Sequence, residues 1–228
     1  MPDVKRRVAI FAALANPIRL RIVDLLTLGD LSSSEIELLL KLRSNLVAHH
    51  LRVLEKADIV SRSRSEFDRR RSYIGLHPEV FGTLAPSDVP APDRVVFVCT
   101  GNAARSLLAE AIWPKHSRIP AVAATTNPKP ATAPPEVMDA AARHSLTLTG
   151  PVTPVSVVLN NRVQDSRDLV ITVCDNAHEQ MLGREDLHWS IPDPGASGSP
   201  EEFDNTITLT SRRIHALALR LNTRTETR

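Results

Sequence analysis

The stretch from Val95 to Ser106, VVFVCTGNAARS, places a cysteine and an arginine six positions apart, directly after a run of apolar residues. An apolar run of this length is typical of a buried strand, so we expect Cys99 at the end of a strand and Arg105 close to a following helix. A thiolate is a nucleophile, and a guanidinium can donate paired hydrogen bonds to two oxygens of a tetrahedral anion. The spacing therefore predicts that Cys99 attacks an oxyanion that Arg105 holds.

The loop between this strand and the next helix has the composition of an anion-binding loop. Its backbone N–H groups should point inward, and the positive end of the helix dipole adds to them. Gly101 allows a tight path, Asn102 tolerates unusual backbone angles, and Ser106 can donate to the sulfur. The same donors predict a lowered pKa for the Cys99 thiol. The predicted oxyanion-binding residues are Thr100, Gly101, Asn102, Ala103, Ala104, Arg105 and Ser106.

The elements around this loop alternate between strand and helix. Apolar strands are expected at 94–99, 119–125 and 168–174, and helices at 106–116 and 135–145. A closing helix should begin at SPEE, residues 199–202, which combines an N-cap serine with proline in the first turn. Its predicted core stripe is Phe203, Ile207, Ile214, Leu217 and Leu221. This order predicts an α/β domain, with a parallel sheet covered by helices on both faces.

The front of the chain has a different pattern, with helices expected at 4–15 and 17–28. A third helix should follow Ser32, because Ser32 and Glu35 form a capping-box pattern, and a fourth should follow Ser44 as its N-cap. Two helices joined by about three residues indicate a helix-turn-helix. Residues 59–76 then alternate as a β-hairpin, so the expected fold is an α+β winged helix-turn-helix.

The second helix of such a pair lies in the major groove of DNA, and its exposed residues contact base edges. Arginines in the hairpin suit phosphate contacts. Val47 and Leu51 should face the core, which leaves the other early residues outward. The adjacent His49 and His50 point about 100° apart on a helix and cannot chelate one ion together, so no metal site is expected. The predicted DNA-binding residues are Ser44, Asn45, Leu46, Ala48, His49, Arg62, Arg64, Arg69, Arg70 and Arg71.

The 228 residues carry a net charge of +2, and 42% are hydrophobic, as in a soluble globular protein. Residues 1–86 hold 14 Lys+Arg against 10 Asp+Glu, whereas 87–228 hold 14 against 16, so the basic surplus lies in the front domain. We expect a winged-helix domain at 1–80, a proline-rich linker at 81–93 and the α/β domain at 94–228. No signal peptide or membrane span is evident, and two cysteines make no disulfide framework, so a cytoplasmic protein is expected.

The front segment, from LANPIRLRIVDLL through VAHHLRVLEKADIV to the hairpin, resembles the ArsR/SmtB family of winged-helix repressors over roughly residues 4–78. The resemblance implies a homodimer bound to a double-stranded DNA operator. Members that sense metalloids often carry a cysteine pair at the start of the third helix, where this chain has LGDLSSSE. A domain without thiols lacks the soft ligands that As(III) prefers.

The back segment resembles low-molecular-weight protein tyrosine phosphatases and the arsenate reductases that share their fold, over residues 94–222. VVFVCTGNAARSLLAEA, DLVITVC and HWSIPDP follow one another in the expected order. The resemblance implies that Cys99 attacks phosphorus or arsenic, that Arg105 holds the oxyanion and that Asp193 protonates the leaving oxygen. It also makes Cys174 a candidate resolving thiol, matched to a cysteine of the thioredoxin-coupled reductases.

The thiol relay of those reductases is incomplete, because Ala104 and Met181 stand where two of their cysteines would be. A reductase must deliver two electrons, so the missing thiol would come from an external low-molecular-weight thiol or a glutaredoxin-like reductant, with no bound cofactor. The expected function is a DNA-binding regulator joined to an arsenate reductase of arsenic resistance. Two alternatives stay open: an oxyanion sensor with weak turnover that controls the repressor, and a protein tyrosine phosphatase acting on a phosphorylated substrate.

Overall fold

A computed structural model describes residues 4–77, 91–100, 104–161, 166–181, 183–196 and 198–222. The chain divides into two compact units, Met1–Ser87 and Asp88–Arg228. Most of the linker expected at 81–93 lies outside the described residues. Within the described part, no helix is long and apolar enough to cross a membrane.

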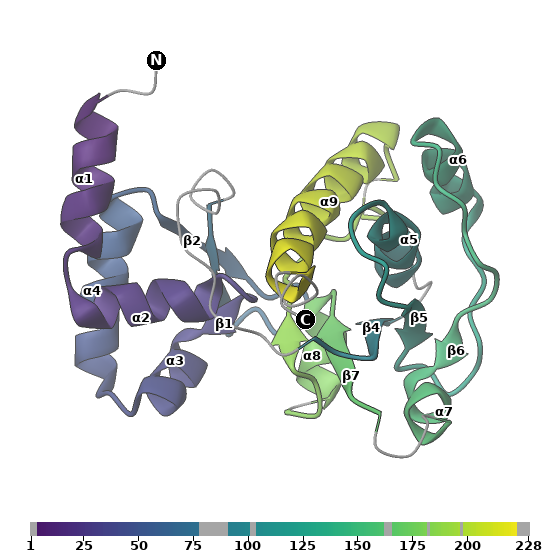
Figure 1. The fold of residues 1–228 in the computed structure, drawn as a ribbon, viewed down its shortest axis with the longest axis horizontal. Coiled ribbons are helices and arrows are strands. Elements are labelled where there is room, and N and C mark those ends of the chain that lie inside the picture. The colour runs from purple at the N-terminus through teal and green to yellow at the C-terminus, as the bar shows by residue number, and fades with distance from the viewer. Residues whose placement is uncertain are drawn as a thin grey trace. The chain divides into compact units, whose positions relative to one another are not determined.

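The first unit is built from four helices and a small antiparallel sheet (Figure 1). Asn16 separates the first two helices, and its side chain accepts hydrogen bonds from the amides of Ile18 and Arg19 at the start of the second. The sheet has the strand order β1-β3-β2. The elements are α1 (Val4–Leu14), α2 (Pro17–Leu26), β1 (Leu31–Ser32), α3 (Ser33–Leu40), α4 (Ser44–Lys56), β2 (Val60–Arg64) and β3 (Ser72–Leu76).

Two predictions about helix starts had different outcomes. The capping box is present: the Ser32 hydroxyl accepts from the Glu35 amide at 3.3 Å, and the Glu35 carboxylate accepts from the Ser32 amide at 2.6 Å. The expectation that Ser44 caps α4 was wrong, because Arg43 is the N-cap residue and makes no side-chain cap. The Arg43 carbonyl accepts from the amides of Leu46 and Val47, which places Ser44 inside the first turn.

Replacing Ser32 with alanine should lower the free energy of unfolding of the first unit by about 1 kcal/mol, because the Glu35 amide loses its acceptor. Urea titration followed by circular dichroism measures this change. Ser34→Ala is the matched control, since Ser34 is exposed on the same helix. Equal losses in the two variants would show that the capping box contributes nothing specific.

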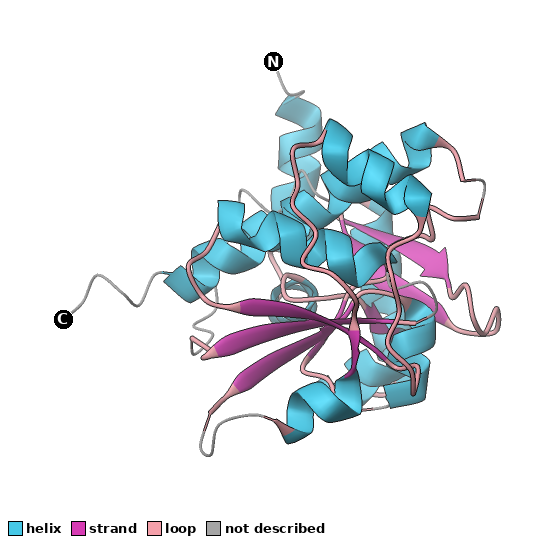
Figure 2. Ribbon diagram, turned by 90° about the vertical axis from the view of Figure 1, so that its right-hand side faces the viewer, coloured by secondary structure: helices cyan, strands magenta, loops and turns pink. Residues whose placement is uncertain are grey.

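The second unit is a five-stranded parallel sheet with the strand order β6-β5-β4-β7-β8. Figures 1 and 2 show helices on both sides of this sheet, as predicted for an α/β domain. The predicted core stripe of the last helix is buried from Phe203 to Leu221. The elements are β4 (Arg94–Cys99), α5 (Ala104–Ile112), η2 (Trp113–Lys115), β5 (Ala121–Thr125), α6 (Pro135–Arg143), β6 (Thr153–Pro154), α7 (Val155–Asn160), β7 (Asp168–Thr172), α8 (Asp175–Met181), β8 (Leu187–His188) and α9 (Pro200–Asn222).

The topology fixes where a site can form. The chain adds β5 and β6 on one side of β4 and later adds β7 and β8 on its other side, so the order in which strands are added reverses between β4 and β7. In open parallel sheets, ligands bind at the carboxyl ends of the strands where this reversal occurs. Cys99 ends β4, and Cys174 follows β7 by two residues. The fold therefore brings both cysteines to the expected crevice.

Candidate active site and nucleic-acid interface

The two cysteines are free, buried and next to each other at the sheet edge. The parallel pairing of β4 with β7 places Val98 opposite Thr172. Cys99 and Cys174 come one and two residues after this pair, so they lie on neighbouring segments at the carboxyl ends of the two strands. The Ala177 amide donates to the Cys174 sulfur at 3.4 Å, and the Thr100 hydroxyl lies 3.6 Å from the same sulfur. The structure thus supplies polar contacts that stabilise a thiolate at this pair.

The charge distribution within the pair differs from the expectation for Cys99. The hydrogen bond with Cys174, followed by burial, raises the pKa of Cys99 well above its ordinary value. The same hydrogen bond, helped by Arg105 and Thr100, lowers the pKa of Cys174 to about 6. The prediction of a lowered pKa for Cys99 was therefore wrong for the free site, because a second sulfur competes for the charge.

Arg105 lies in the first turn of α5 and is 7% exposed. Its guanidinium donates to the Ile191 carbonyl at 2.7 Å and approaches the Asp193 carboxylate at 3.8 Å. The Asp193 carboxylate also accepts from the Gly195 amide at 3.1 Å, and its side chain is half exposed. Arg105 therefore connects the start of α5 to the loop that carries the predicted general acid.

A cavity of about 470 Å³ opens over these groups. Cys99, Arg105 and Asp193 all line it, so three of the four predicted catalytic residues share a single cavity. The full described lining is Cys99, Thr100, Ala104, Arg105, Pro134, Glu136, Val137, Asp193, Gly195, Gly198 and Phe203. A nucleophile, a cation and an acid around one cavity suit attack on a tetrahedral oxyanion with protonation of its leaving group.

The remaining predicted residues have other places. Cys174 is fully buried behind Cys99 and is not among the described lining residues. Ser106 is also fully buried, within α5, rather than in the loop. The predicted oxyanion-binding residues Gly101, Asn102 and Ala103 lie outside the described residues.

The sequence pattern missed part of the cavity wall. Pro134, Glu136 and Val137 belong to the start of α6, and Phe203 belongs to α9. A signal for α6 was present, since this helix follows the strand next to β4 and so begins at the same sheet edge. Phe203 was predicted only as a core residue, and nothing in the local sequence indicates that it also reaches the cavity.

Buried residues beneath the site support the loop that carries Asp193. The His188 ring lies 3.0 Å from the Thr172 hydroxyl and 3.2 Å from the Asp175 carboxylate. Trp189 is buried and packs against Phe97 of β4, with ring centroids 5.9 Å apart. These contacts anchor the segment before Asp193 to β4, β7 and α8, and so hold in place the backbone that carries the predicted general acid.

Glu136 adds an exposed carboxylate to the wall of the predicted anion site. Because like charges repel, Glu136→Gln should strengthen inhibition by inorganic phosphate by about threefold at low ionic strength. Competitive inhibition constants at low and high salt measure this effect, which should shrink as salt is added. Glu201→Gln removes the same charge from an exposed position that does not line the cavity. Equal effects from both variants would contradict a local role for Glu136.

The first unit presents the predicted contact face of α4 to solvent. Val47 and Leu51 are fully buried, whereas Ser44, Asn45, Leu46, Ala48 and His49 are exposed. Arg43 and Arg52 are exposed next to this face and were not predicted. The helical repeat was a usable signal for Arg52, since it lies three and four positions after His49 and Ala48.

The five hairpin arginines divide into two groups. Arg62 pairs with Glu55 at 3.3 Å, and Arg70 pairs with Asp68 at 3.0 Å. Arg64, Arg69 and Arg71 are exposed, and none forms a salt bridge with a described acidic residue. An arginine that is already paired with a carboxylate displaces fewer counterions from DNA when it binds a phosphate. Arg64, Arg69 and Arg71 are therefore better suited to phosphate contacts than Arg62 and Arg70.

The fold and the site define a winged helix-turn-helix domain followed by an α/β domain with a cysteine at the strand-to-helix junction. The model of the low molecular weight phosphotyrosine protein phosphatases matches residues 94–227, more than half of the chain. The chain therefore belongs to this family. A helix-turn-helix domain model matches residues 14–62 of the first domain.

Known proteins resemble one domain or the other. The transcriptional repressor SdpR of Bacillus subtilis (strain 168) is 33% identical over 55 residues, which are 24% of this chain. The chain spans 61% of the length of that curated relative. Tyrosine phosphatase Wzb of Escherichia coli K30, solved with sulphate, is 22% identical, with a TM-score of 0.48, covering 57% of this chain and 99% of its own. Arsenate reductase of Archaeoglobus fulgidus DSM 4304 is 21% identical, with a TM-score of 0.43, covering 54% and 98%.

Proposed function

We propose that the second domain is an arsenate reductase with Cys99 as nucleophile and Cys174 as resolving thiol. The observation that carries this proposal is that two free, buried thiols, Cys99 and Cys174, follow paired strands at the same end of the sheet, beside a cavity that Arg105 and Asp193 also line. A hydrolase needs one thiol, whereas reduction of arsenic needs two electrons, which two thiols supply when they form a disulfide.

The reaction balances with these groups. The Cys99 thiolate attacks As(V) while Arg105 holds two arsenate oxygens, and a hydroxyl leaves as water with the proton of Asp193. The Cys174 thiolate then attacks the Cys99 sulfur, which forms the disulfide and leaves the electron pair of the S–As bond on arsenic. Arsenic departs as arsenite. An external low-molecular-weight thiol or a glutaredoxin-like protein reduces the disulfide with two further electrons.

Arsenate turnover by the full chain with a small thiol and glutaredoxin tests this proposal, with arsenite as the measured product. Arsenite formation that depends on Cys99 and on a thiol donor is the expected result. Tight arsenate binding with neither arsenite nor phosphate release would favour an oxyanion sensor instead.

A phosphatase is the second candidate, and the observation that favours it is Phe203 in the cavity wall. An aromatic ring beside the site can pack against the phenol of a phosphorylated tyrosine. In this reaction Cys99 takes the phosphoryl group, Asp193 protonates the leaving alcohol, and water attacks the phosphocysteine. Hydrolysis of an aryl phosphate without arsenite formation would support this alternative.

We infer that the first domain binds double-stranded DNA as a repressor-type homodimer. The exposed face of α4 supports DNA contact, as do Arg64, Arg69 and Arg71, which form no salt bridge with a described acidic residue. Val8 and Phe11 on α1 are 61% and 60% exposed, which provides an apolar surface for a second copy. Sedimentation of the full chain measures the dimer, and selection from random duplexes provides the operator.

Removing one of these three hairpin cations should weaken DNA binding measurably. Arg64→Gln should lower affinity for the selected operator by about fivefold and reduce the salt slope by about one. Arg70→Gln is the matched control, because Asp68 already pairs with that guanidinium. Binding titrations over a range of salt give both quantities. A larger loss from Arg70→Gln would contradict the division of the hairpin arginines.

We further propose that oxyanion binding at the Cys99 site changes the DNA affinity of the first domain. The support is that the first domain has no cysteine with which to sense arsenic, yet it shares a chain with an oxyanion site. Arsenate, phosphate and arsenite titrated against operator-bound protein test this coupling. Unchanged DNA affinity with all three anions would remove it.

A further inference from the structure

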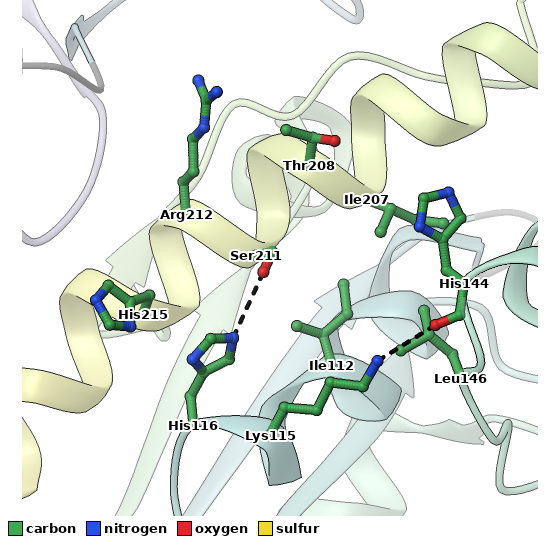
Figure 3. Close-up of a pocket in the computed structure, with 10 residues that line it drawn as sticks. All are labelled: Ile112, Lys115, His116, His144, Leu146, Ile207, Thr208, Ser211, Arg212 and His215. Atoms are coloured by element: carbon green, nitrogen blue, oxygen red, sulfur yellow. Dashed lines mark hydrogen bonds between the residues drawn. The ribbon is translucent and has the colours of Figure 1, made fainter.

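A second cavity of about 430 Å³ lies elsewhere in the α/β domain, between α9 and the segments that follow α5 and α6 (Figure 3). Its described lining shares no residue with the cavity around Cys99. The end of α5 and η2 form one side of the cavity, and α9 forms another. The described lining is Ile112, Lys115, His116, His144, Leu146, Ile207, Thr208, Ser211, Arg212 and His215.

Basic side chains dominate the polar part of this lining, and its described residues include no aspartate or glutamate. The Lys115 ammonium donates to the His144 carbonyl at 3.2 Å, which fixes this cation at the wall (Figure 3). Arg212 is exposed on α9 and makes no salt bridge with a described acidic residue. Asp204 of α9 is outside the described lining; its carboxylate lies 2.9 Å from the His144 ring and also pairs with Arg143. An anion entering this cavity therefore meets cations without a competing carboxylate in the described lining.

Two histidines meet at one end of the cavity. The rings of His116 and His215 are 5.3 Å apart, and a ring nitrogen of His116 lies 3.4 Å from the Ser211 hydroxyl. Burial, the neighbouring His215 and the Lys115 charge lower the pKa of His116. These groups repel one another when protonated, and an anion between them would relieve that repulsion.

The floor of the cavity is apolar. Ile112, Leu146 and Ile207 are buried core residues that also face this space. An inorganic oxyanion would leave this floor uncovered, whereas an apolar body would cover it. We propose that the cavity binds a small organic anion: a carboxylate or phosphate monoester carried on an aromatic or branched aliphatic body.

The test uses the full chain with ¹⁵N-labelled histidine and phenylphosphonate as the probe, because a phosphonate cannot be hydrolysed. The ring signals of His116 and His215, assigned with the single glutamine variants, should shift and saturate. The anion favours the protonated His116 ring, so the dissociation constant should rise as the pH increases through the lowered pKa of His116. Lys115, His144 and Arg212 are the other charged or titratable residues of the described lining, and the Asp204 carboxylate lies 2.9 Å from the His144 ring.

Lys115→Gln should weaken this binding by about tenfold, because it removes the cation that the His144 carbonyl holds at the wall. Lys129→Gln is the matched control, since Lys129 is an exposed lysine that does not line the cavity. Shifts confined to other histidines, or equal effects of the two variants, would overturn the site. Equal affinity for inorganic phosphate would overturn the role of the apolar floor. A response to duplex DNA but not to phenylphosphonate would assign the cations to nucleic acid instead.

Discussion

Cys99→Ser should lower arsenate turnover and aryl-phosphate hydrolysis by about four orders of magnitude, the scale at which enzymes lose activity when a covalent nucleophile is removed. The serine hydroxyl keeps the size of the side chain but stays protonated at neutral pH, so it cannot attack arsenic or phosphorus. Arg105 and Asp193 keep their contacts with the loop at Ile191 and Gly195 in this variant. Oxyanion binding should therefore survive while catalysis is lost.

Two measurements separate these effects. Initial rates with arsenate or an aryl phosphate give the loss of turnover, and calorimetric titration with inorganic phosphate gives the binding that remains. Loss of both would indicate a damaged fold rather than a missing nucleophile. Retention of full hydrolysis by Cys99→Ser would contradict the role of Cys99 in either candidate reaction.

The sequence predicted this site well where the chemistry is local. Most of a buried strand, a loop and the start of a helix occupy the twelve residues from Val95 to Ser106. The sequence therefore already places Cys99 at the end of the strand and Arg105 at the start of the helix. The core stripe of α9 was equally visible, because an amphipathic helix of 23 residues repeats its pattern many times. The short elements α7, α8, β6 and β8 were not predicted, since two to seven residues carry too few repeats for a periodic signal.

Long-range contacts set the limit of the prediction. Glu136 and Phe203 reach the cavity from segments distant in sequence, and only the packing of α6 and α9 shows this. The pKa of Cys99 was predicted in the wrong direction, because the decisive neighbour is Cys174, 75 positions away. The pairing of Arg62 with Glu55 has the same origin, since hairpin register and the end of α4 determine it together.

Cys174→Ser should separate the two candidate reactions. In a reductase that resolves its adduct internally, the serine cannot attack the Cys99 sulfur, so arsenite formation should fall by at least about a hundredfold. Aryl-phosphate hydrolysis requires no second thiol and should persist. Parallel assays of the two reactions on the same preparation measure this difference, and the hydrolysis assay controls for folding. Arsenite formation at the original rate would show that an external thiol resolves the Cys99 adduct.

The pH dependence of hydrolysis in the same variant tests the charge distribution within the pair. The hydrogen bond with Cys174 and its charge raise the pKa of Cys99, whereas Arg105 and the Thr100 amide lower it. Removing the Cys174 sulfur leaves burial as the opposing effect, so the pKa of Cys99 should fall. The Cys99 thiolate then forms at lower pH, and the acid limb of the kcat/KM profile should move toward lower pH. A limb that stays in place or moves upward would show that Cys174 does not compete with Cys99 for the charge.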